Sequence, residues 1–337
     1  MTRSQVIEML NTKPAGALLV RADRARAATC GESVHLRGII EYSNHCGRRC
    51  AYCGINADNR SLQRYRLTMA QVRTIAAEAV GRGVRTIVLQ AGEDPAFTAD
   101  KIAAIVETVK LLGDVAVTLS CGEFHRDAYR RMRDAGADRY LIKFETSNEA
   151  LYERLHPDSR LDDRLCCIRD LADLGFQTGS GSLVGLPEQT VEDIADDLLL
   201  AVALELDMAT FSPFLPHPQT PLAAETGGTG ELALRTLAAA RLLLPHAHIP
   251  VSTALATACD DGYRRGLQAG ANVVMANLTP PDAARHYDLY PGKTTRRAGR
   301  DPVDHLRGLI ESLGRTTATD RGDSLRQAPV GAGRSER

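Results

Sequence analysis

Short apolar runs alternate with stretches of helical periodicity along most of this chain. The runs are mostly continuous in apolar residues, as strands buried on both faces require. We expect strands at residues 36–42, 85–90, 115–120, 139–144, 176–184, 208–214, 249–255 and 271–277. The helical stretches lie between them, at residues 68–82, 98–112, 125–135, 161–174, 190–205, 230–244 and 258–269.

Regular alternation of strand and helix indicates parallel strands. Eight such strands favour an α/β fold of the (β/α)8 TIM-barrel type, with a doubly wound sheet as the alternative. Residues 1–34 predict an N-terminal helical extension, and residues 35–313 predict the barrel. Residues 314–337 have almost nothing to bury, so we expect a flexible polar tail there.

Polar residues gather where the expected strands end. The segments "QAGED" (90–94), "SCGE" (120–123), "ETSN" (145–148) and "GSGSLVGLPEQT" (179–190) each follow a strand. In a barrel of parallel strands the carboxyl ends meet on one face, which carries the active site. The pattern therefore predicts one site assembled from several strand ends.

Charge and hydropathy narrow the possible partners. The 41 basic and 42 acidic residues nearly cancel, and no basic stripe indicates nucleic-acid binding. No apolar run has membrane-spanning length, and the N-terminus lacks the order of a signal peptide. We therefore expect a cytoplasmic protein with neither nucleic acid nor membrane as a partner. In that reducing compartment the eight cysteines are unsuited to a disulfide framework.

Three cysteines cluster in "SNHCGRRCAYCG", residues 43–54: Cys46, Cys50 and Cys53. Three thiolates on a cubane iron–sulfur cluster leave one iron open to a small molecule. A zinc site could use the same cysteines with His45 or a distant residue. Zinc ligands usually come as two separated pairs, and no second Cys-x2-Cys pair exists here. Unbound thiols remain a further alternative.

The spacing Cys-x3-Cys-x2-Cys, with Tyr52 before the last cysteine, resembles the signature of radical S-adenosylmethionine (SAM) enzymes. That resemblance implies one 4Fe-4S cluster on the three cysteines, with SAM on the open iron. Electron transfer into SAM would then break a C–S bond and give a 5′-deoxyadenosyl radical. The SAM contacts that the resemblance implies are Tyr52, Gly92, Glu93, Glu145, Arg164, Gly185 and Asn277.

Longer motifs, from "RGIIEYSNHC" to "GANVVMANLTPP" and "LYPGK", resemble the HydE family of FeFe-hydrogenase maturases over residues 35–313. The family implies an iron complex carrying CO, cyanide and cysteine as substrate, and a di-iron precursor as product. The implied partners are the maturases HydG and HydF, with a ferredoxin or flavodoxin as reductant. The candidate substrate contacts are Lys143, Ser180, Thr253, Thr279 and Tyr290.

Some HydE-type proteins have three further cysteines near the C-terminus, whereas residues 292–314 here have none, so we expect a single cluster. Two other functions stay open. The chain could act on an organic substrate, as methylornithine synthase and biotin synthase do, or it could be a non-catalytic iron–sulfur protein. The sequence leaves Cys121 and His217 without an assigned role, since core packing and a proline-rich turn would explain them equally well.

Overall fold

The computed structural model describes residues 1–293 and 301–326. Parallel strands form a continuous curved sheet in the order β6-β5-β4-β3-β2-β1-β7. Their bounds are β1 (Ser33–Ser43), β2 (Thr86–Ala91), β3 (Ala116–Ser120), β4 (Arg139–Leu141), β5 (Gln177–Val184), β6 (Met208–Pro213) and β7 (Val273–Asn277). Each lies within or overlaps one of the predicted runs, so the parallel α/β barrel is confirmed.

The seventh predicted strand, residues 249–255, is wrong as a regular strand. Only residues 248–251 pair with neighbouring strands, and they do so on both sides. The amide of Ala209 donates to the carbonyl of His248 at 3.0 Å, and that of Val251 donates to Val273 at 3.0 Å. This segment therefore closes the ring between β6 and β7. From Thr253 the chain turns into the helix α10 (Thr253–Ala258).

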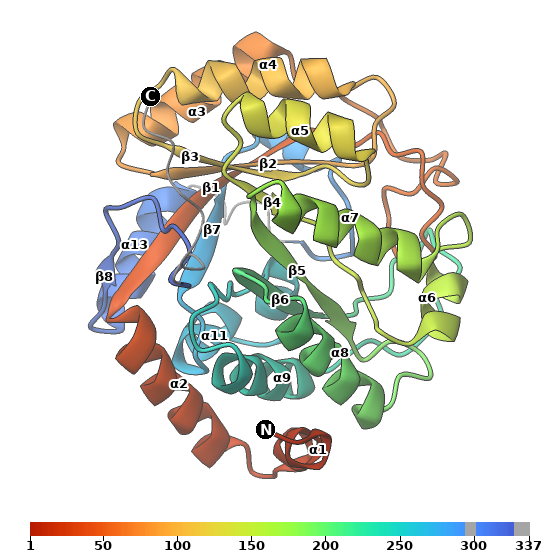
Figure 1. Cartoon of the computed structure of the whole chain (residues 1–337), viewed down its shortest axis with the longest axis vertical. Helices are drawn as coiled ribbons and strands as arrows, with labels where there is room; N and C mark the ends of the chain where they lie inside the picture. The colour runs from red at the N-terminus through yellow and green to blue at the C-terminus, as the bar shows by residue number, and fades with distance from the viewer. Residues whose placement is uncertain (294–300, 327–337) are drawn as a thin grey trace.

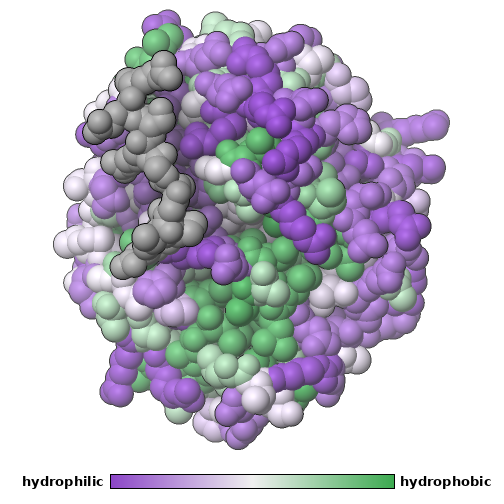
Figure 2. Space-filling model, in the orientation of Figure 1, coloured by the Kyte–Doolittle hydropathy of each residue, from purple (hydrophilic) through white to green (hydrophobic). Residues whose placement is uncertain are grey.

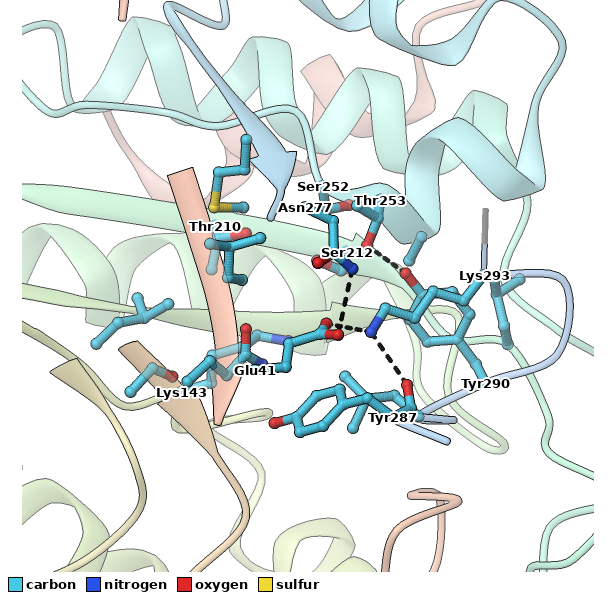
Figure 3. A pocket seen from close by; sticks show the side chains of 18 of the residues that line it. Glu41, Lys143, Thr210, Ser212, Ser252, Thr253, Asn277, Tyr287, Tyr290 and Lys293 are labelled. Atoms are coloured by element: carbon cyan, nitrogen blue, oxygen red, sulfur yellow. Dashed lines mark hydrogen bonds and ion pairs between the residues drawn. The ribbon is translucent and has the colours of Figure 1, made fainter. Parts of the chain in front are cut away.

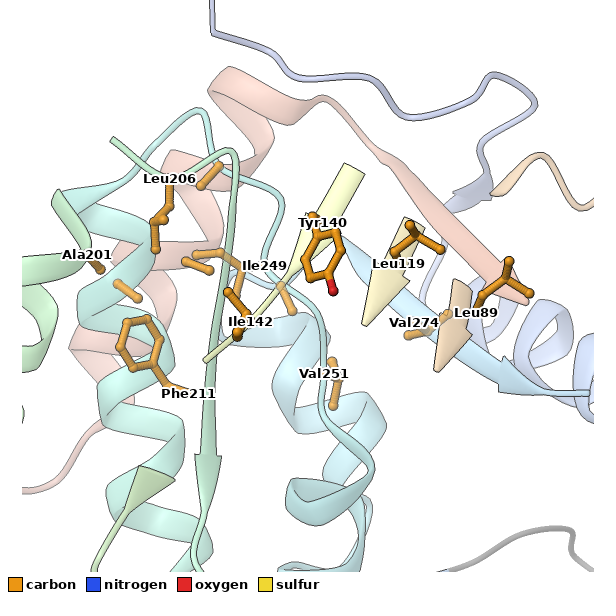
Figure 4. Packing of buried hydrophobic residues seen from close by; sticks show 14 of the residues in the cluster. Leu89, Leu119, Tyr140, Ile142, Ala201, Leu206, Phe211, Ile249, Val251 and Val274 are labelled. Carbon is orange, nitrogen blue, oxygen red and sulfur yellow. The ribbon is translucent and has the colours of Figure 1, made fainter. Parts of the chain in front are cut away.

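Helices surround the strands, as Figure 1 shows. They are α3 (Met69–Gly81), α4 (Ala99–Lys110), α5 (Arg126–Asp134), α6 (Glu149–Leu155), α7 (Leu161–Asp173), α8 (Val191–Ala203), α9 (Gly230–Leu243), α11 (Gly262–Gln268), α12 (Pro281–Ala284) and α13 (Pro302–Ser312). Buried side chains such as Leu89, Leu119 and Val274 fill the core (Figure 4). Along β1 the sides alternate: Ile40 packs in this core, while Ile39 and Glu41 line a cavity.

The N-terminal extension consists of α1 (Arg3–Asn11) and α2 (Gly16–Cys30), which lie outside the ring (Figure 1). They pack against α8 and α9. The hydroxyl of Thr2 and the side chain of Gln5 form a capping box that satisfies amides at the start of α1. Val6 and Leu10 are fully buried, so the helix is held by its apolar face.

The expected tail is wrong for residues 314–326, which are bound to the barrel. Strand β8 (Thr316–Thr317) pairs with the start of β1. The fully buried guanidinium of Arg139 donates to the carbonyls of Arg321 and Gly322, each at 2.7 Å, and contacts the carboxylate of Asp323 at 2.8 Å. Polar contacts with a buried cation thus hold this apolar-poor segment. Residues 327–337 of the expected tail lie outside the described residues.

The face shown in Figure 2 is mostly hydrophilic, with a hydrophobic area low in its centre, where Figure 1 draws β6, α9 and α11. Within residues 1–293 and 301–326, no helix combines the length and apolar character needed to cross a membrane.

Candidate functional site

A cavity of about 510 Å³ lies at the carboxyl ends of the strands. Most of the expected site residues line it, although they come from points far apart in the sequence. These are Cys46, Cys50, Tyr52, Cys53, Gly92, Glu93, Lys143, Glu145, Arg164, Thr253, Asn277 and Tyr290. The fold therefore brings the predicted strand-end segments together.

The three cysteines lie on the loop after β1, which is held by hydrogen bonds rather than regular structure. The guanidinium of Arg64 donates to four loop carbonyls, those of Asn44, Ile55, Asn56 and Asn59, at 2.5 to 3.1 Å. The amide of Ala51 donates to the carbonyl of Leu155 at 2.8 Å. Arg64 thus joins four points of the loop, and these hydrogen bonds fix where the thiols lie.

Burial raises the pKa of Cys53 to about 12 and raises those of Cys46 and Cys50, which also face one another. As free thiols all three would stay protonated, so a positively charged iron centre is what favours their thiolate forms. Among residues 1–293 and 301–326, no three His, Cys, Asp or Glu side chains converge on one metal ion. A cubane cluster spreads its thiolate ligands over different irons. Three half-buried thiols on one cavity wall therefore fit such a cluster.

Two glycines let neighbouring strand ends approach the cysteine loop. A Cβ on Gly92 would lie 2.4 Å from the carbonyl oxygen of His45 and 2.7 Å from Cβ of Cys46. A Cβ on Gly122, whose φ is +91°, would lie 1.8 Å from Cγ of Glu93. The segment "QAGED" thus needs glycine at 92 because the backbone of the cysteine loop lies against it. The segment "SCGE" needs glycine at 122 because the side chain of Glu93 lies against it.

Four charged side chains form a chain of ion pairs along the same wall. Arg48 contacts Glu93 at 2.5 Å and Glu123 at 2.5 Å, and Glu123 contacts Nε of Arg164 at 2.5 Å. Nη1 of Arg164 donates to the carbonyl of Lys143 at 2.5 Å. Burial raises the pKa of Glu93, and Arg48 opposes that rise. A ligand carboxylate at Arg164 would therefore share the guanidinium with Glu123.

A second group lies around Tyr52. Its hydroxyl donates to Oε1 of Glu145 at 3.1 Å and lies 3.2 Å from Nε2 of His156. Nζ of Lys143 lies 2.7 Å from Oε2 of Glu145. Glu145 has a φ of 64°, in the left-handed region, and turns the chain four residues after the end of β4. Tyr52 thus holds Oε1 of Glu145 by a hydrogen bond, while Lys143 balances the charge near Oε2 without a hydrogen bond to it.

A third group, drawn in Figure 3, closes the other side of the cavity. The buried carboxylate of Glu41 pairs with Lys293 and accepts a hydrogen bond from Asn277 at 3.2 Å. Nζ of Lys293 also donates to the carbonyl of Tyr287 at 3.0 Å and lies 4.4 Å from the centre of its ring. The hydroxyls of Tyr290 and Thr253 are hydrogen-bonded.

Sequence reasoning missed Glu41, Lys293 and Tyr287 and assigned no role to Glu123. Glu41 and Lys293 are 252 residues apart, so no local pattern pairs them. A lone acid within the apolar run 36–42 was the one available signal, since a buried charge needs a partner. Glu123 precedes α5, whose N-cap is His125, and its carboxylate pairs with Arg48 and Arg164.

Three expected site residues do not line the cavity. The hydroxyl of Ser180 accepts a hydrogen bond from the amide of Phe144 at 3.2 Å, and that of Thr279 accepts one from Glu41 at 2.9 Å. Both residues are buried behind the wall, so the structure contradicts their expected contact with substrate. Gly185, with a φ of +81°, donates its amide to Oε1 of Gln189 at 2.7 Å and shapes the wall from behind.

Cys121 and His217 also lie outside the cavity lining. Sγ of Cys121 is buried 3.2 Å from the hydroxyl of Tyr140, in agreement with core packing. Nδ1 of His217 accepts the amide of Gln219, and Nε2 lies 3.0 Å from Asp288. Residues 294–300, part of the segment 292–314 that has no cysteines, lie outside the described residues.

Comparison with known protein families points to the same cluster-binding chemistry as the three cysteines on the cavity wall. Residues 40–201 match the model of the radical SAM superfamily. The FeFe hydrogenase maturase subunit HydE of Thermotoga maritima is 44% identical over 329 residues, which cover 96% of this chain and 94% of that protein. The 3-methylornithine synthase of Methanosarcina acetivorans is 29% identical over 264 residues, 78% of this chain and 74% of that protein.

Solved structures share the fold. The crystal structure of methylornithine synthase has a TM-score of 0.84 at 25% identity and covers 94% of each chain. That of HydG, a maturase of FeFe hydrogenase, has a TM-score of 0.79 at 20% identity, over 93% of this chain and 72% of that one. The second likeness concerns the fold alone. The chain belongs to the radical SAM superfamily and, within it, to the family of the FeFe hydrogenase maturase subunit HydE.

Proposed function

We propose that this protein is a radical SAM maturase that acts in assembly of the di-iron cofactor of FeFe hydrogenase. The observation that carries this proposal is the 44% identity to the Thermotoga maritima subunit over 96% of the chain. The cavity supports it, because three half-buried thiols and several paired charges line one space. The product would be a precursor of the di-iron cofactor.

Cys46, Cys50 and Cys53 would hold a 4Fe-4S cluster with one open iron. When bound, that cluster supplies the electron that breaks a C–S bond of SAM. Arg164 offers the SAM carboxylate a guanidinium that Glu123 already orients at 2.5 Å. Glu93 and Glu145 face the same space with carboxylates suited to an amino group or to ribose hydroxyls.

The substrate we propose is an iron complex carrying CO, cyanide and cysteine. Lys143, Thr253 and Tyr290 line the part of the cavity beyond the cysteines and offer a cation and hydroxyl groups. Inside low-dielectric walls such groups act more strongly on an anion than they would in water. Lys143 is shared with Glu145, so an anionic ligand would draw on a cation that already has a partner.

The single cluster remains a prediction, based on a chain with no cysteine beyond Cys259. We also propose HydG as the source of the complex, HydF as the acceptor of the product, and a ferredoxin or flavodoxin as reductant. The cytoplasmic location expected from the sequence stays a prediction as well.

A second candidate function is radical chemistry on an amino acid. The likeness to methylornithine synthase favours it, with a TM-score of 0.84 over 94% of both chains. An amino acid and a cysteine-bearing iron complex present similar carboxylate and amino groups to the cavity. The cavity residues alone therefore do not separate these two substrates.

The two functions are separated by supplying each substrate to the reduced, cluster-loaded protein under anaerobic conditions with SAM. We expect the iron complex to be consumed, with an adenosyl product detected by mass spectrometry, while free amino acids stay unchanged. Conversion of an amino acid without any change in the iron complex would establish the second function instead.

A further inference from the structure

Asp197 is a fully buried carboxylate on α8, outside the cavity lining. Its Oδ1 accepts hydrogen bonds from the amide of Ser147 at 2.6 Å and from the hydroxyl of Ser147 at 2.7 Å. Its Oδ2 accepts one from Nε2 of Gln189 at 3.3 Å. Burying a carboxylate is costly unless such bonds satisfy it, so the arrangement fixes the groups that make them.

Gln189 carries the connection to the turn after β5. Its Oε1 accepts the amides of Gly185 at 2.7 Å and Leu186 at 3.2 Å, and its Nε2 donates to the carbonyl of Leu183 at 3.0 Å. The side chain of Leu183 lines the cavity. Through Gln189, Asp197 therefore holds the cavity wall that β5 contributes.

Ser147 carries the connection to the segment after β4. It lies two residues beyond Glu145, whose backbone is bonded on both sides to β5, through the carbonyl of Gly181 and the amide of Leu183. The side chain of Asn148 donates to Oδ1 of Asp193 at 2.9 Å. Asp193 and Asp197 are four residues apart and thus lie on one face of α8, which holds this segment at two points.

We propose that Asp197 is a positioning residue for SAM: it fixes Glu145 and the Leu183–Leu186 turn relative to each other. Two cavity walls that are adjacent in the sheet but come from different segments then form one surface. Asp197 does this without touching the ligand. The inference rests on the proposed function, because it requires that SAM binds between these walls.

The test compares Asp197→Asn with Asp196→Asn in the reconstituted full chain. Asp196 is the next residue on α8 but is solvent-accessible and paired with Arg3, so it is a matched control. The asparagine has the shape of aspartate, yet it must either turn an NH2 group toward the donors of Ser147 or lose the bond from Gln189. Cluster content, KM for SAM and kcat for 5′-deoxyadenosine formation are measured at equal iron loading.

At pH 8, above the raised pKa of Asp197, we expect Asp197→Asn to raise the KM for SAM about tenfold, the effect of losing one charge-assisted hydrogen bond. The kcat at saturating SAM should change less than about twofold. Asp196→Asn should leave both values unchanged. An unaltered KM in a folded, cluster-loaded Asp197→Asn would overturn the proposal. A lower kcat at unaltered KM would also overturn it, since that is the signature of a merely reduced active fraction.

If Asp197→Asn does not fold, Ser147→Ala removes the hydroxyl that donates to Oδ1 and keeps the amide that donates there as well. This variant is judged by the same split between KM and kcat. Wild-type protein that holds a cluster but neither binds nor cleaves SAM would refute the proposed function itself. A wild type that cleaves SAM normally, with an Asp197→Asn variant that has the same KM and kcat, would refute only the positioning role of Asp197.

Discussion

Gly122 combines a steric and a conformational requirement at one residue of the site. Its φ is +91°, and a Cβ would lie 1.8 Å from Cγ of Glu93. Gly113 has a φ of +125° but nothing within 4 Å of a Cβ, so it isolates the conformational part. Gly113→Ala should cost about 1 to 3 kcal/mol of unfolding free energy from backbone strain alone.

We predict that Gly122→Ala loses SAM cleavage, because the new methyl group displaces Glu93 from Arg48 and from the cavity. Gly113→Ala should keep the activity of the wild type at a temperature where both variants are folded. Formation of 5′-deoxyadenosine at equal cluster content checks this. Equal activity in the two alanine variants would show that the position of Glu93 is unimportant.

Asp197 also makes stability depend on pH. Burial raises its pKa to about 7, against the opposing hydrogen bonds from Ser147. The folded state then binds this proton more tightly than the unfolded state, so the contribution is full below the unfolded pKa and is lost as the pH rises toward 7. Relative to Asp197→Asn, which does not titrate, the wild type should lose stability between about pH 4 and pH 7 and change little above that, as measured by chemical unfolding. A pH-independent difference would contradict this.

Local spacing was enough to predict some site residues and could not predict others. Cys46, Cys50 and Cys53 lie within one short segment, so their spacing alone indicates a shared ligand. Arg164 on α7 and Glu123 in the segment after β3 are 41 residues apart, and a sequence pattern does not contain their contact. Long-range ion pairs are properties of the fold.

At the scale of elements, the buried pair of Glu41 and Lys293 ties the segment after α12 to β1. Lys293→Met leaves the carboxylate of Glu41 buried without its cation, which should destabilise the protein by roughly 3 kcal/mol or more. Adding Glu41→Gln removes the unpaired charge, so the double variant should regain much of that loss. Denaturant unfolding of both variants checks this, and a double variant that is less stable than Lys293→Met would contradict it.

The run at residues 249–255 shows why element boundaries are harder to predict than element types. "IPVSTAL" is apolar enough for a strand, yet the hydroxyl of Ser252 accepts the amide of Leu255 at 3.2 Å and starts α10. A serine before a short helix is a capping signal. In the sequence it competes with the strand pattern, and only the geometry of ring closure decides between them.

At the scale of the whole molecule, residues 314–326 close the amino-terminal end of the barrel. A chain ending at residue 313 would remove Asp323 and two carbonyl acceptors from Arg139 and let water reach its guanidinium. Its free energy of unfolding should fall by roughly 1.5 to 3 kcal/mol, because water replaces only part of these hydrogen bonds to a charged group. A chain ending at residue 326 should melt like the full chain, and equal melting of the two shortened chains would refute this role.

The overall fold was predictable because strand and helix alternate regularly, whereas the role of residues 314–326 was not. Their sequence has few apolar side chains, and counting those gives no reason for order. What binds them is a cation on β4, which attracts carbonyls and a carboxylate from the far end of the chain. Composition indicates how much apolar surface a segment can bury. It does not indicate which buried polar or charged groups elsewhere in the chain the segment can bond to.

The central claim is that Cys46, Cys50 and Cys53 hold the cluster at which SAM is cleaved. It is tested most directly by measuring 5′-deoxyadenosine, free or as an adduct, after anaerobic reconstitution, reduction and addition of SAM. We predict formation by the wild type and none by Cys50→Ala, which should also fail to assemble the cubane cluster. Cleavage of SAM by Cys50→Ala at the rate of the wild type would contradict the claim.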